Sequence, residues 1–362
     1  MSIIDLGLPI TPRSVRDDDA PSSGPLIDTF GRVASDLRVS VTDRCNLRCT
    51  YCMPAEGLDW LPSEDLLTTD EFVRVLTVAV RDLGIRRIRF TGGEPLLRRD
   101  LEELIAAASN MPEAPELALT TNGLGLRHRA QALADAGLHR INVSLDTIDP
   151  ARFAQITRRD RLSNVLDGLA AARDAGLQPV KVNAVVPNRD DLAGLPDLLR
   201  FCLGEGYQLR IIEQMPLDAD HRWDRGAMVT ADEILTTLRR TFELDPDPRP
   251  RGGAPAATWL VRGHTDPTGQ TARVGVIASV TRPFCGDCDR TRLTADGALR
   301  NCLFADAETS LMPALRGGLS ETALDAEIAR RWRGDMWHKA AGHAVNTTDF
   351  RQPDRPMSAI GG

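Results

Sequence analysis

The sequence predicts an α/β fold built from parallel βα repeats, and three observations lead to this prediction. Short β-branched and apolar runs alternate with amphipathic segments from Leu37 onward, and several amphipathic segments end on a glycine. The chain has 362 residues, enough to bury a large core. Parallel strands need a crossover, which a helix after each strand supplies. This pattern alone leaves open a doubly wound sheet or a partial barrel.

Each expected strand is followed by an expected helix. The strands are Leu37–Val41, Arg87–Thr91, Glu116–Thr121, Arg140–Asp146, Pro179–Val186 and Gln208–Met215. The helices are Thr69–Leu83, Arg99–Ala108, Arg127–Ala136, Arg161–Ala175, Leu192–Leu203 and Ala231–Thr241. Thr68, with Glu71 three residues later, has the spacing of a capping box and places the start of the first helix.

The two ends of the chain differ from this middle part. The N-terminal residues mix Pro, Ser and Gly with the acidic run Asp17–Asp19, which predicts a mobile leader. After residue 244 Pro and Gly become frequent, and Thr258–Arg262 with Arg273–Ser279 predicts a hairpin, followed later by a helix at Thr322–Arg333. The expected regions are a leader (1–33), a βα region (34–244) and a C-terminal region (245–362).

Composition and charge exclude several classes of protein. A formal net charge of −7 argues against broad binding of nucleic acid, although a local basic site for a small anion remains possible. No apolar run approaches the roughly 18 residues that span a bilayer, and the N-terminus lacks the pattern of a signal peptide. We therefore expect a cytoplasmic protein without membrane contact. Its seven cysteines are then better read as metal ligands or reactive thiols than as disulfides.

A first set of three cysteines follows the first expected strand. Cys45, Cys49 and Cys52 stand in TDRCNLRCTYCMP, on a loop of the kind that carries the chemistry in βα folds. Thiolates suit iron–sulfur clusters, and three ligands for four irons leave one iron open to bind another molecule. The alternative is a zinc knuckle, which would want a fourth Cys or His nearby.

A second set lies in the C-terminal region. Cys285 and Cys288 form a CxxC pair, and Cys302 follows an expected turn at Ala295–Gly297. Here the alternative is a structural zinc site with a remote fourth ligand such as His264. The seventh cysteine, Cys202, lies on an apolar helix face and is expected to be a buried hydrophobic residue.

The first cysteine set resembles that of the radical SAM (S-adenosylmethionine) superfamily. The hallmark of that superfamily is a CxxxCxxC loop with an aromatic residue before the third cysteine, here Tyr51. The sequence TGGEP at Thr91–Pro95 is similar to the motif that holds the amino group of SAM in the superfamily. Glycines at this place let backbone approach a neighbour closely.

Within that superfamily the chain resembles the GTP cyclases of molybdenum cofactor biosynthesis. The similarity runs from about Arg38 to Gly362 and includes RVSVTDRCNLRCTYCMP, RIRFTGGEPLLRRDL, FCGDCDRTRL and the final Gly-Gly. It implies an incomplete (βα)₆ TIM-like barrel with a C-terminal extension carrying an auxiliary iron–sulfur cluster. The implied cofactors are two [4Fe–4S] clusters and SAM. One cluster would be held by Cys45, Cys49 and Cys52 and the auxiliary one by Cys285, Cys288 and Cys302.

The resemblance also implies roles for single residues. SAM would contact Tyr51, Gly93, Ser144 and Met215. GTP would contact Arg38, Arg89, Thr120, Lys181, Arg290, Thr291 and Arg292. A charge inside a strand, as at Arg89 or Lys181, needs a buried partner, and a polyphosphate suits that need. Composition predicts a frayed C-terminal tail, whereas the resemblance implies that Gly361 and Gly362 enter the barrel and act with Arg38 in the radical step.

In the family, SAM is cleaved by one electron to a 5′-deoxyadenosyl radical, which abstracts the ribose 3′ hydrogen of GTP before the sugar carbon adds to C8 of guanine. The implied partners are a reduced electron donor such as a flavodoxin and the downstream cyclic pyranopterin monophosphate synthase, with the protein a monomer or a homodimer. Two other readings are a radical SAM enzyme that modifies peptides and a non-catalytic iron–sulfur or zinc scaffold. The TGGEP motif beside two incomplete ligand sets argues against a scaffold.

Overall fold

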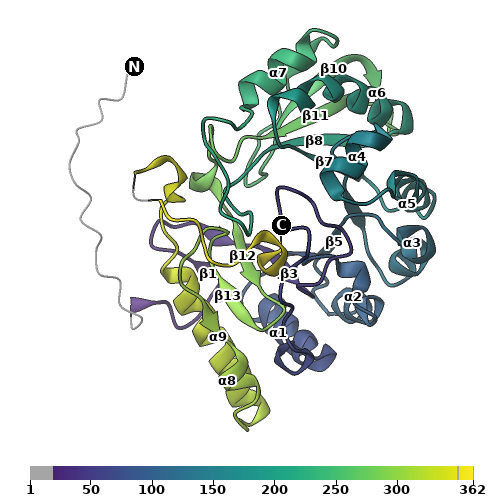
Figure 1. Ribbon diagram of the computed structural model, residues 1–362. Helices are drawn as coiled ribbons and strands as arrows, with labels where there is room; N and C mark the ends of the chain where they lie inside the picture. The colour runs from purple at the N-terminus through teal and green to yellow at the C-terminus, as the bar shows by residue number, and fades with distance from the viewer. Residues whose placement is uncertain (1–18, 349, 362) are drawn as a thin grey trace.

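A computed structural model of the chain describes residues 19–348 and 350–361 (Figure 1). A twelve-stranded sheet in the order β14-β13-β12-β3-β4-β5-β6-β7-β8-β11-β10-β9 forms its centre. The helices that follow the strands cover the outer side of this curved sheet (Figure 1). The predicted α/β class is confirmed. No helix within the described ranges has the length and apolar composition needed to cross a bilayer.

The expected strands are all present, and their ends agree with the prediction to within two residues. They are β3 (Asp36–Ser40), β4 (Arg87–Thr91), β5 (Glu116–Thr121), β6 (Arg140–Ser144), β7 (Val180–Val186) and β8 (Gln208–Glu213). Each pairs in parallel with the next, so their carboxyl ends lie along one edge. Loops leaving these strands therefore meet on one side of the molecule.

Helices connect these strands as predicted, with one addition. They are α1 (Thr69–Arg81), α2 (Leu101–Ser109), α3 (Leu126–Asp135), α4 (Pro150–Thr157), α5 (Leu162–Asp174), α6 (Leu195–Glu205) and α7 (Ala231–Arg239). Thr68 and Glu71 form the predicted capping box at the start of α1. The helix α4 was not expected; it begins at Pro150 after Asp149, whose carboxylate accepts from the Arg152 N–H at 2.6 Å.

The C-terminal region extends the same sheet at both edges. It contains β9 (Leu244–Pro246), β10 (Ala257–Thr265), β11 (Thr271–Ile277), β12 (Arg290–Leu293), β13 (Ala298–Arg300) and β14 (Thr309–Ser310). The expected hairpin is β10–β11, and β11 also pairs in parallel with β8, whereas β12 pairs in parallel with β3. The change of pattern near residue 244 is thus not a break in the sheet. Three helices follow: α8 (Met312–Leu315), α9 (Glu321–Trp337) and α10 (Met357–Ile360).

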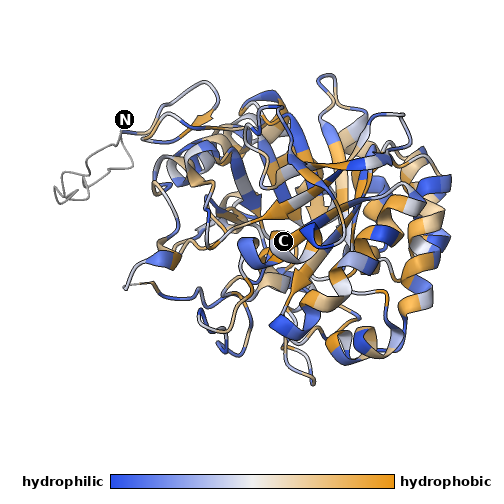
Figure 2. Cartoon of the chain, turned by 90° about the horizontal axis from the view of Figure 1, so that it is seen from above, coloured by the Kyte–Doolittle hydropathy of each residue, from blue (hydrophilic) through white to orange (hydrophobic). Residues whose placement is uncertain are grey.

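Strand periodicity separates the two faces of the sheet. Residues such as Leu37 and Val39 on β3, or Ile88 and Phe90 on β4, are buried toward the helices. In Figure 2 the strands of the sheet are rich in hydrophobic residues, and the surrounding helices mix hydrophobic with hydrophilic residues. The alternate residues of each strand face the inner, concave side. That inner side carries the polar residues from which the candidate site is built.

Part of the predicted leader belongs to the folded body. Leu26–Ile27 (β1) pairs with Val33–Ala34 (β2), and Leu26 is fully buried against the core. Arg32 forms an ion pair with Asp28 at 2.5 Å and donates to the backbone oxygen of Cys285 at 2.7 Å. These contacts bring the hairpin into the fold, which composition could not indicate because they join residues far apart in sequence. Residues 1–18 of the predicted leader lie outside the described part.

Candidate active site

The first cysteine set lies on the loop that leaves the carboxyl end of β3. The Arg48 guanidinium donates to the backbone oxygens of Cys45 and Leu47, at 2.7 and 2.8 Å. The Cys52 N–H donates to the Cys49 carbonyl at 2.9 Å. All three cysteines line one cavity of about 240 Å³. The loop therefore brings the three thiols to one site, as the spacing predicts.

Burial favours the neutral, protonated form of the thiols of this set. Burial and the nearby Cys45 raise the pKa of Cys52 to about 12. Burial and the Asp146 carboxylate raise the pKa of Cys49 well above its usual value. Thiolates at Cys49 and Cys52 are therefore stable here only beside a cationic metal group, because no basic side chain is among the main influences on either residue. Soft thiolate ligands on one short loop fit an iron–sulfur cluster.

The glycines of TGGEP hold the cysteine loop against the sheet. The Gly93 N–H donates to the Thr42 carbonyl at 2.8 Å, and the Glu94 N–H donates to the Arg44 carbonyl at 2.7 Å. A Cβ on Gly93 would lie 2.3 Å from the Arg44 oxygen, and one on Gly92 would lie 2.3 Å from the Thr42 oxygen. Side chains there would push the loop away. Gly92 and Gly93 therefore serve the packing of the loop as well as the cavity they line.

Glu94, the fourth residue of the motif, is fully buried and held by several donors. It accepts from the Leu96 N–H, the Thr121 hydroxyl and the Asn122 N–H at 2.9, 2.6 and 2.7 Å. Burial raises its pKa to about 7, although these donors oppose that shift. The Asn122 side chain in turn donates to Asn46 at 2.7 Å and lies 3.8 Å from the Cys45 sulfur. Glu94 thus ties the end of β5 to the cysteine loop.

The residues assigned to SAM by resemblance line the same cavity as the three cysteines. These residues are Tyr51, Gly93, Ser144 and Met215. The Tyr51 hydroxyl donates to Asp146 at 2.8 Å, and the other Asp146 oxygen accepts from the Val185 N–H at 2.8 Å. Burial raises the pKa of Asp146 to about 6. Sequence reasoning did not single out Asp146, which follows β6 at the edge where the functional loops meet.

The second cysteine set lies beside β12 and β13 among basic groups. Lys339 Nζ lies 3.4 Å from the Cys288 sulfur, and the Arg290 guanidinium lies 3.9 Å from it. Burial acts to raise the pKa of Cys288, but these two cations outweigh it and lower the pKa overall. Burial raises the pKa of Cys302, and Arg292 partly offsets that rise. A thiolate at Cys288 is therefore stabilised by the protein itself.

The histidine of the zinc alternative lies in an aromatic contact. His264 lies on β10 with its ring edge-on to Phe242, at a centroid distance of 5.9 Å. Within residues 19–348 and 350–361, no group of three or more His, Cys, Asp or Glu side chains is arranged to hold a single metal ion. Cys202 is fully buried in α6, as expected for a hydrophobic residue.

Basic side chains from several strands meet on the concave side of the sheet. Arg38 lies in register with Arg292 on β12 and with Arg89 on β4. Lys181 on β7 and Arg210 on β8 lie near enough to these arginines to influence one another electrostatically. We call Arg38, Arg89, Lys181, Arg210, Arg290 and Arg292 the basic chamber. Asp36 is buried among them and pairs with Arg38 at 2.8 Å, which leaves the chamber with an excess of positive charge.

Unpartnered polar atoms show that the basic chamber suits an anionic ligand. Arg89 Nε and Arg210 Nε, which are both donors, are buried without a hydrogen-bond partner. Burial and the neighbouring arginines lower the pKa of Lys181 to about 6, and burial lowers the pKa of Arg292 to about 9. Buried cations that repel one another are costly unless an anion joins them. A polyphosphate would supply that anion.

Two of the predicted substrate residues, Thr291 and Thr120, lie outside the basic chamber. The side chain of Thr291 lies on the opposite face of β12 from those of Arg290 and Arg292. Its hydroxyl accepts a hydrogen bond from the Trp332 indole N–H of α9 at 2.9 Å. Its side chain therefore faces α9 and not the chamber, and a contact between Thr291 and the substrate stays a prediction. Thr120 lines the cavity of the first cysteine set and accepts from Asn142 at 3.1 Å.

Two basic residues were missed by sequence reasoning. Arg210 carries the same signal that singled out Arg89, a charge at an inward position of a strand, so the sequence could have found it. Lys339 stands after α9 in no recognisable pattern. Its one signal is rarity, because Lys181 and Lys339 are the only lysines in the sequence.

The C-terminal tail is packed into the candidate site. Gly361 is buried, adopts φ +82°, and its carbonyl accepts a hydrogen bond from the Arg292 guanidinium. A Cβ at Gly361 would lie 2.6 Å from Thr91 Cγ2, so the tail passes close to the TGGEP segment. Ser358 lines the cavity of the first cysteine set, and its backbone interacts with Cys52. The frayed tail that composition predicts is therefore not found. Gly362 lies outside the described residues.

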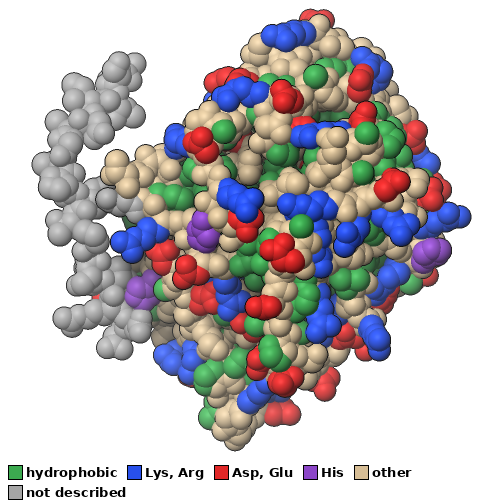
Figure 3. Space-filling model, in the orientation of Figure 1, with side chains coloured by type: hydrophobic (Ala, Val, Ile, Leu, Met, Phe, Trp, Pro, Cys, Tyr) green, Lys and Arg blue, Asp and Glu red, His purple; other side chains and the backbone are tan. Residues whose placement is uncertain are grey.

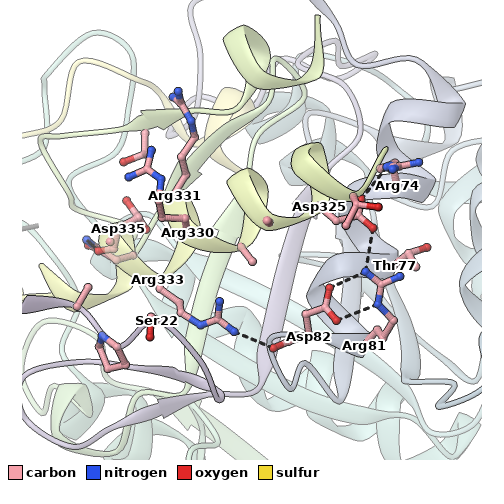
Figure 4. A pocket seen from close by; sticks show the side chains of 18 of the residues that line it. Ser22, Arg74, Thr77, Arg81, Asp82, Asp325, Arg330, Arg331, Arg333 and Asp335 are labelled. Carbon is pink, nitrogen blue, oxygen red and sulfur yellow. Dashed lines mark hydrogen bonds and ion pairs between the residues drawn. The ribbon is translucent and has the colours of Figure 1, made fainter. Parts of the chain in front are cut away.

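A second, larger hollow of about 1370 Å³ lies between α1, α9 and residues 20–22 (Figure 4). Its arginines are engaged with neighbours: Arg81 pairs with Asp82 and Asp325, and Arg333 donates to the Asp82 carbonyl. On the face of the molecule seen in Figure 3, basic and acidic side chains are interspersed. The basic chamber differs from these surfaces because its cations are buried and in excess.

Family models match most of the chain in two consecutive segments. Residues 39–202 match the model of the radical SAM superfamily, and residues 207–345 match a model described as Molybdenum Cofactor Synthesis C. A GTP 3′,8-cyclase of Mycolicibacterium smegmatis is 60% identical over 370 aligned positions, covering 100% of both chains. A GTP 3′,8-cyclase 2 of Mycobacterium tuberculosis is 60% identical and covers 94% of this chain and 93% of its own.

Solved structures share the fold at low sequence identity. SuiB of Streptococcus suis bound to S-adenosylmethionine superposes with a TM-score of 0.55 at 13% identity, covering 89% of this chain and 76% of that one. A structure of anSMEcpe with bound AdoMet gives a TM-score of 0.51 at 15% identity, covering 76% of this chain and 77% of that one. These likenesses show that the α/β fold is shared with both structures.

Proposed function

This chain belongs to the GTP 3′,8-cyclase family of the radical SAM superfamily, and on that premise we propose how its residues carry out the reaction. The enzyme cyclises GTP to 3′,8-cyclo-7,8-dihydro-GTP, the first step of molybdenum cofactor biosynthesis. The observation that carries our assignment of residues is the basic chamber, which adjoins the second cysteine set at Arg290 and the C-terminal tail at Arg292. One set suits a cluster that binds SAM, and the chamber suits a triphosphate.

Membership of the superfamily implies a [4Fe–4S] cluster and SAM. Cys45, Cys49 and Cys52 would hold the cluster, and Tyr51, Gly93, Ser144 and Met215 would line the SAM site. When bound, this pair supplies a 5′-deoxyadenosyl radical through one-electron cleavage of SAM. The buried Asp146 holds the Tyr51 hydroxyl at 2.8 Å and fixes this wall of the cavity. Gly93 keeps the cysteine loop against the sheet through its bond to Thr42.

The second cysteine set, Cys285, Cys288 and Cys302, would hold an auxiliary [4Fe–4S] cluster. Its free iron would bind the guanine base, as the family resemblance implies. Lys339 and Arg290 support this assignment because they offset the negative charge of a thiolate at Cys288. No further protein ligand is needed at this site, because three thiolates again leave one of the four irons open.

The basic chamber would bind the triphosphate of GTP. We assign this role to Arg38, Arg89, Lys181, Arg290 and Arg292, add Arg210, and retain Thr120 at the edge toward the SAM site. Guanidinium groups bind phosphate through paired charge-assisted hydrogen bonds. Burial excludes water from these contacts and so strengthens them. The same arginines would orient the ribose toward the cavity of the first cysteine set.

The C-terminal tail would form the wall of the candidate active site next to Arg292. We assign Gly361 and Gly362, with Arg38, to the radical step that follows cleavage of SAM. The bond from Arg292 to the Gly361 carbonyl supports this assignment because it joins the tail to the chamber. Glycine suits the position, since a Cβ at residue 361 would meet Thr91.

We describe the curved sheet as an incomplete (βα)₆ barrel, formed by residues 34–244 and extended by residues 245–362. GTP is the proposed substrate, a reduced flavodoxin-type protein the proposed electron donor, and the cyclic pyranopterin monophosphate synthase the proposed consumer of the product. A peptide substrate is less well supported, because buried cations in excess suit a polyphosphate better than a peptide.

The deciding experiment is anaerobic reconstitution of the purified protein, followed by iron analysis and mass analysis of the products formed from GTP and SAM. We expect about eight irons per chain if both sites hold cubanes. We also expect 5′-deoxyadenosine together with the cyclised nucleotide. Stoichiometric zinc without iron, or SAM cleavage without any change in GTP, would contradict the assignment.

A further inference from the structure

Lys339 is a buried ammonium group whose hydrogen-bond donors are directed at the second cysteine set. Only 3% of the residue is exposed. Its Nζ lies 2.7 Å from the Arg290 carbonyl, 3.4 Å from the Cys288 carbonyl and 3.4 Å from the Cys288 sulfur. An ammonium has three N–H donors, so these contacts use its full capacity. One of the three acceptors is a sulfur that we assign to a cluster.

The backbone that carries Lys339 is anchored on both sides. Before it, the α9 residue Trp332 donates to Thr291 at 2.9 Å, and Asn301 donates to the Asp335 carbonyl at 2.7 Å. After it, the Arg32 guanidinium donates to the carbonyls of Ala340 and Ala341, at 2.6 and 2.9 Å. The same guanidinium donates to the Cys285 carbonyl. The ammonium is therefore held in place rather than merely resting near the sulfur.

Lysine is an unusual choice at this position in this chain, whose other basic residues apart from Lys181 are arginines. An ammonium is a compact point charge with three donors, whereas a guanidinium is a wide planar fork. The two carbonyls and the sulfur around Lys339 come from Cys288 and Arg290, two residues apart in sequence, and converge on one atom. A single nitrogen fits this arrangement.

We propose that Lys339 sets the reduction potential of the auxiliary cluster by donating a charge-assisted hydrogen bond to the Cys288 ligand. This inference rests on the proposed function, because it requires a cluster on Cys285, Cys288 and Cys302. Reduction of that cluster adds one electron, with no bond broken and no proton transferred. A fixed positive charge beside a ligand sulfur stabilises the added electron, so it raises the potential. Lys339 acts through Cys288 and is a positioning residue.

The test is an anaerobic redox titration of the reconstituted holoenzyme with dithionite as reductant, followed by EPR spectroscopy. Lys339→Met removes the ammonium but keeps a flexible apolar chain, and Lys339→Arg restores a positive charge. We expect the midpoint potential of the auxiliary cluster to become more negative in Lys339→Met and to return part of the way in Lys339→Arg. The potential of the N-terminal cluster should stay constant and serves as an internal reference.

Arg331→Met is the matched control, because it removes a positive charge from α9 that pairs with Glu327 at 2.7 Å and not with a cysteine. It should leave both potentials unchanged. An auxiliary potential in Lys339→Met equal to that of the wild type, at equal iron content, would overturn the proposal. Loss of the auxiliary iron in both Lys339→Met and Lys339→Gln would also overturn it and make Lys339 a structural residue. A wild-type protein with only four irons would instead refute the auxiliary cluster itself.

Discussion

The two cysteine sites present the same three ligands in opposite electrostatic surroundings. The first set lies among buried carboxyl groups, Asp146 and Glu94, and burial raises the pKa of its thiols. The second set lies among Lys339, Arg290 and Arg292, which favour the thiolate at Cys288. SAM carries a sulfonium cation, and GTP carries a polyanion. The difference teaches that the charges around each set, more than the cysteines themselves, match the molecule that each site would bind.

The largest expected effect comes from removing one ligand at each site. Cys49→Ala should abolish formation of 5′-deoxyadenosine, because only the first set would hold the cluster that binds SAM. Cys288→Ala should still permit some uncoupled cleavage of SAM while forming no cyclised nucleotide. Both products can be measured by mass spectrometry on one reaction mixture. Full turnover of GTP by Cys288→Ala would mean that the second cysteine set is not required for cyclisation.

The next effect concerns the tail, which joins the basic chamber to the first site. Deletion of Gly361 and Gly362, or Gly361→Ala, should lower the yield of cyclised product by orders of magnitude with iron content and GTP affinity largely intact. Gly269→Ala is the matched control, because Gly269 has nearly the same φ, +81°, but no atom within 4 Å of a new Cβ. Wild-type yield from the truncated protein would show that the tail has no role in catalysis.

A smaller effect is expected from single arginines of the basic chamber. Arg290→Ala, Arg292→Ala and Arg210→Ala should each weaken GTP binding by about tenfold to about a hundredfold, the range expected for loss of one charge-assisted hydrogen bond. Equilibrium binding under anaerobic conditions measures this directly. Arg262→Ala is the control, since that side chain is exposed on β10 and pairs with Asp245. Unchanged affinity in all three chamber variants would place the triphosphate elsewhere.

The smallest effect is a pH dependence carried by Lys181. Its pKa of about 6 in the free protein means that it is largely neutral near pH 8. A bound triphosphate would raise that pKa, so binding takes up a proton and GTP affinity falls as pH rises above about 6, by at most about tenfold per pH unit. Calorimetry in buffers of different ionisation enthalpy measures the proton uptake. Lys181→Met should lose this uptake; equal uptake in wild type and variant would assign it to another group.

Much of the site could be read from local sequence signals. Alternation within strands places Arg38 and Arg89 inward, and the same rule would have found Arg210 and turned Thr291 outward. The spacing of Cys45, Cys49 and Cys52 after a strand predicts one shared site, and the three residues line one cavity of about 240 Å³. These signals work because a strand repeats every two residues and a short loop keeps its ligands together.

Other features were decided by tertiary structure alone. β12 pairs with β3 across more than 250 residues of sequence, which brings Arg290 and Arg292 beside Arg38. The N-terminal hairpin reaches Cys285 through Arg32, Lys339 reaches Cys288 from the end of α9, and the tail reaches Arg292 through Gly361. Each of these contacts joins segments that lie far apart in the sequence.

The sequence by itself thus determined the repeating strands and helices, the two sets of ligands and the family. The tertiary structure decided which charges surround each set and that the hairpin of β1 and β2 packs against the folded body. The physical reason is range: periodicity and ligand spacing act over a few residues, whereas the field at a buried thiol is the sum over every group that the folded chain brings near it.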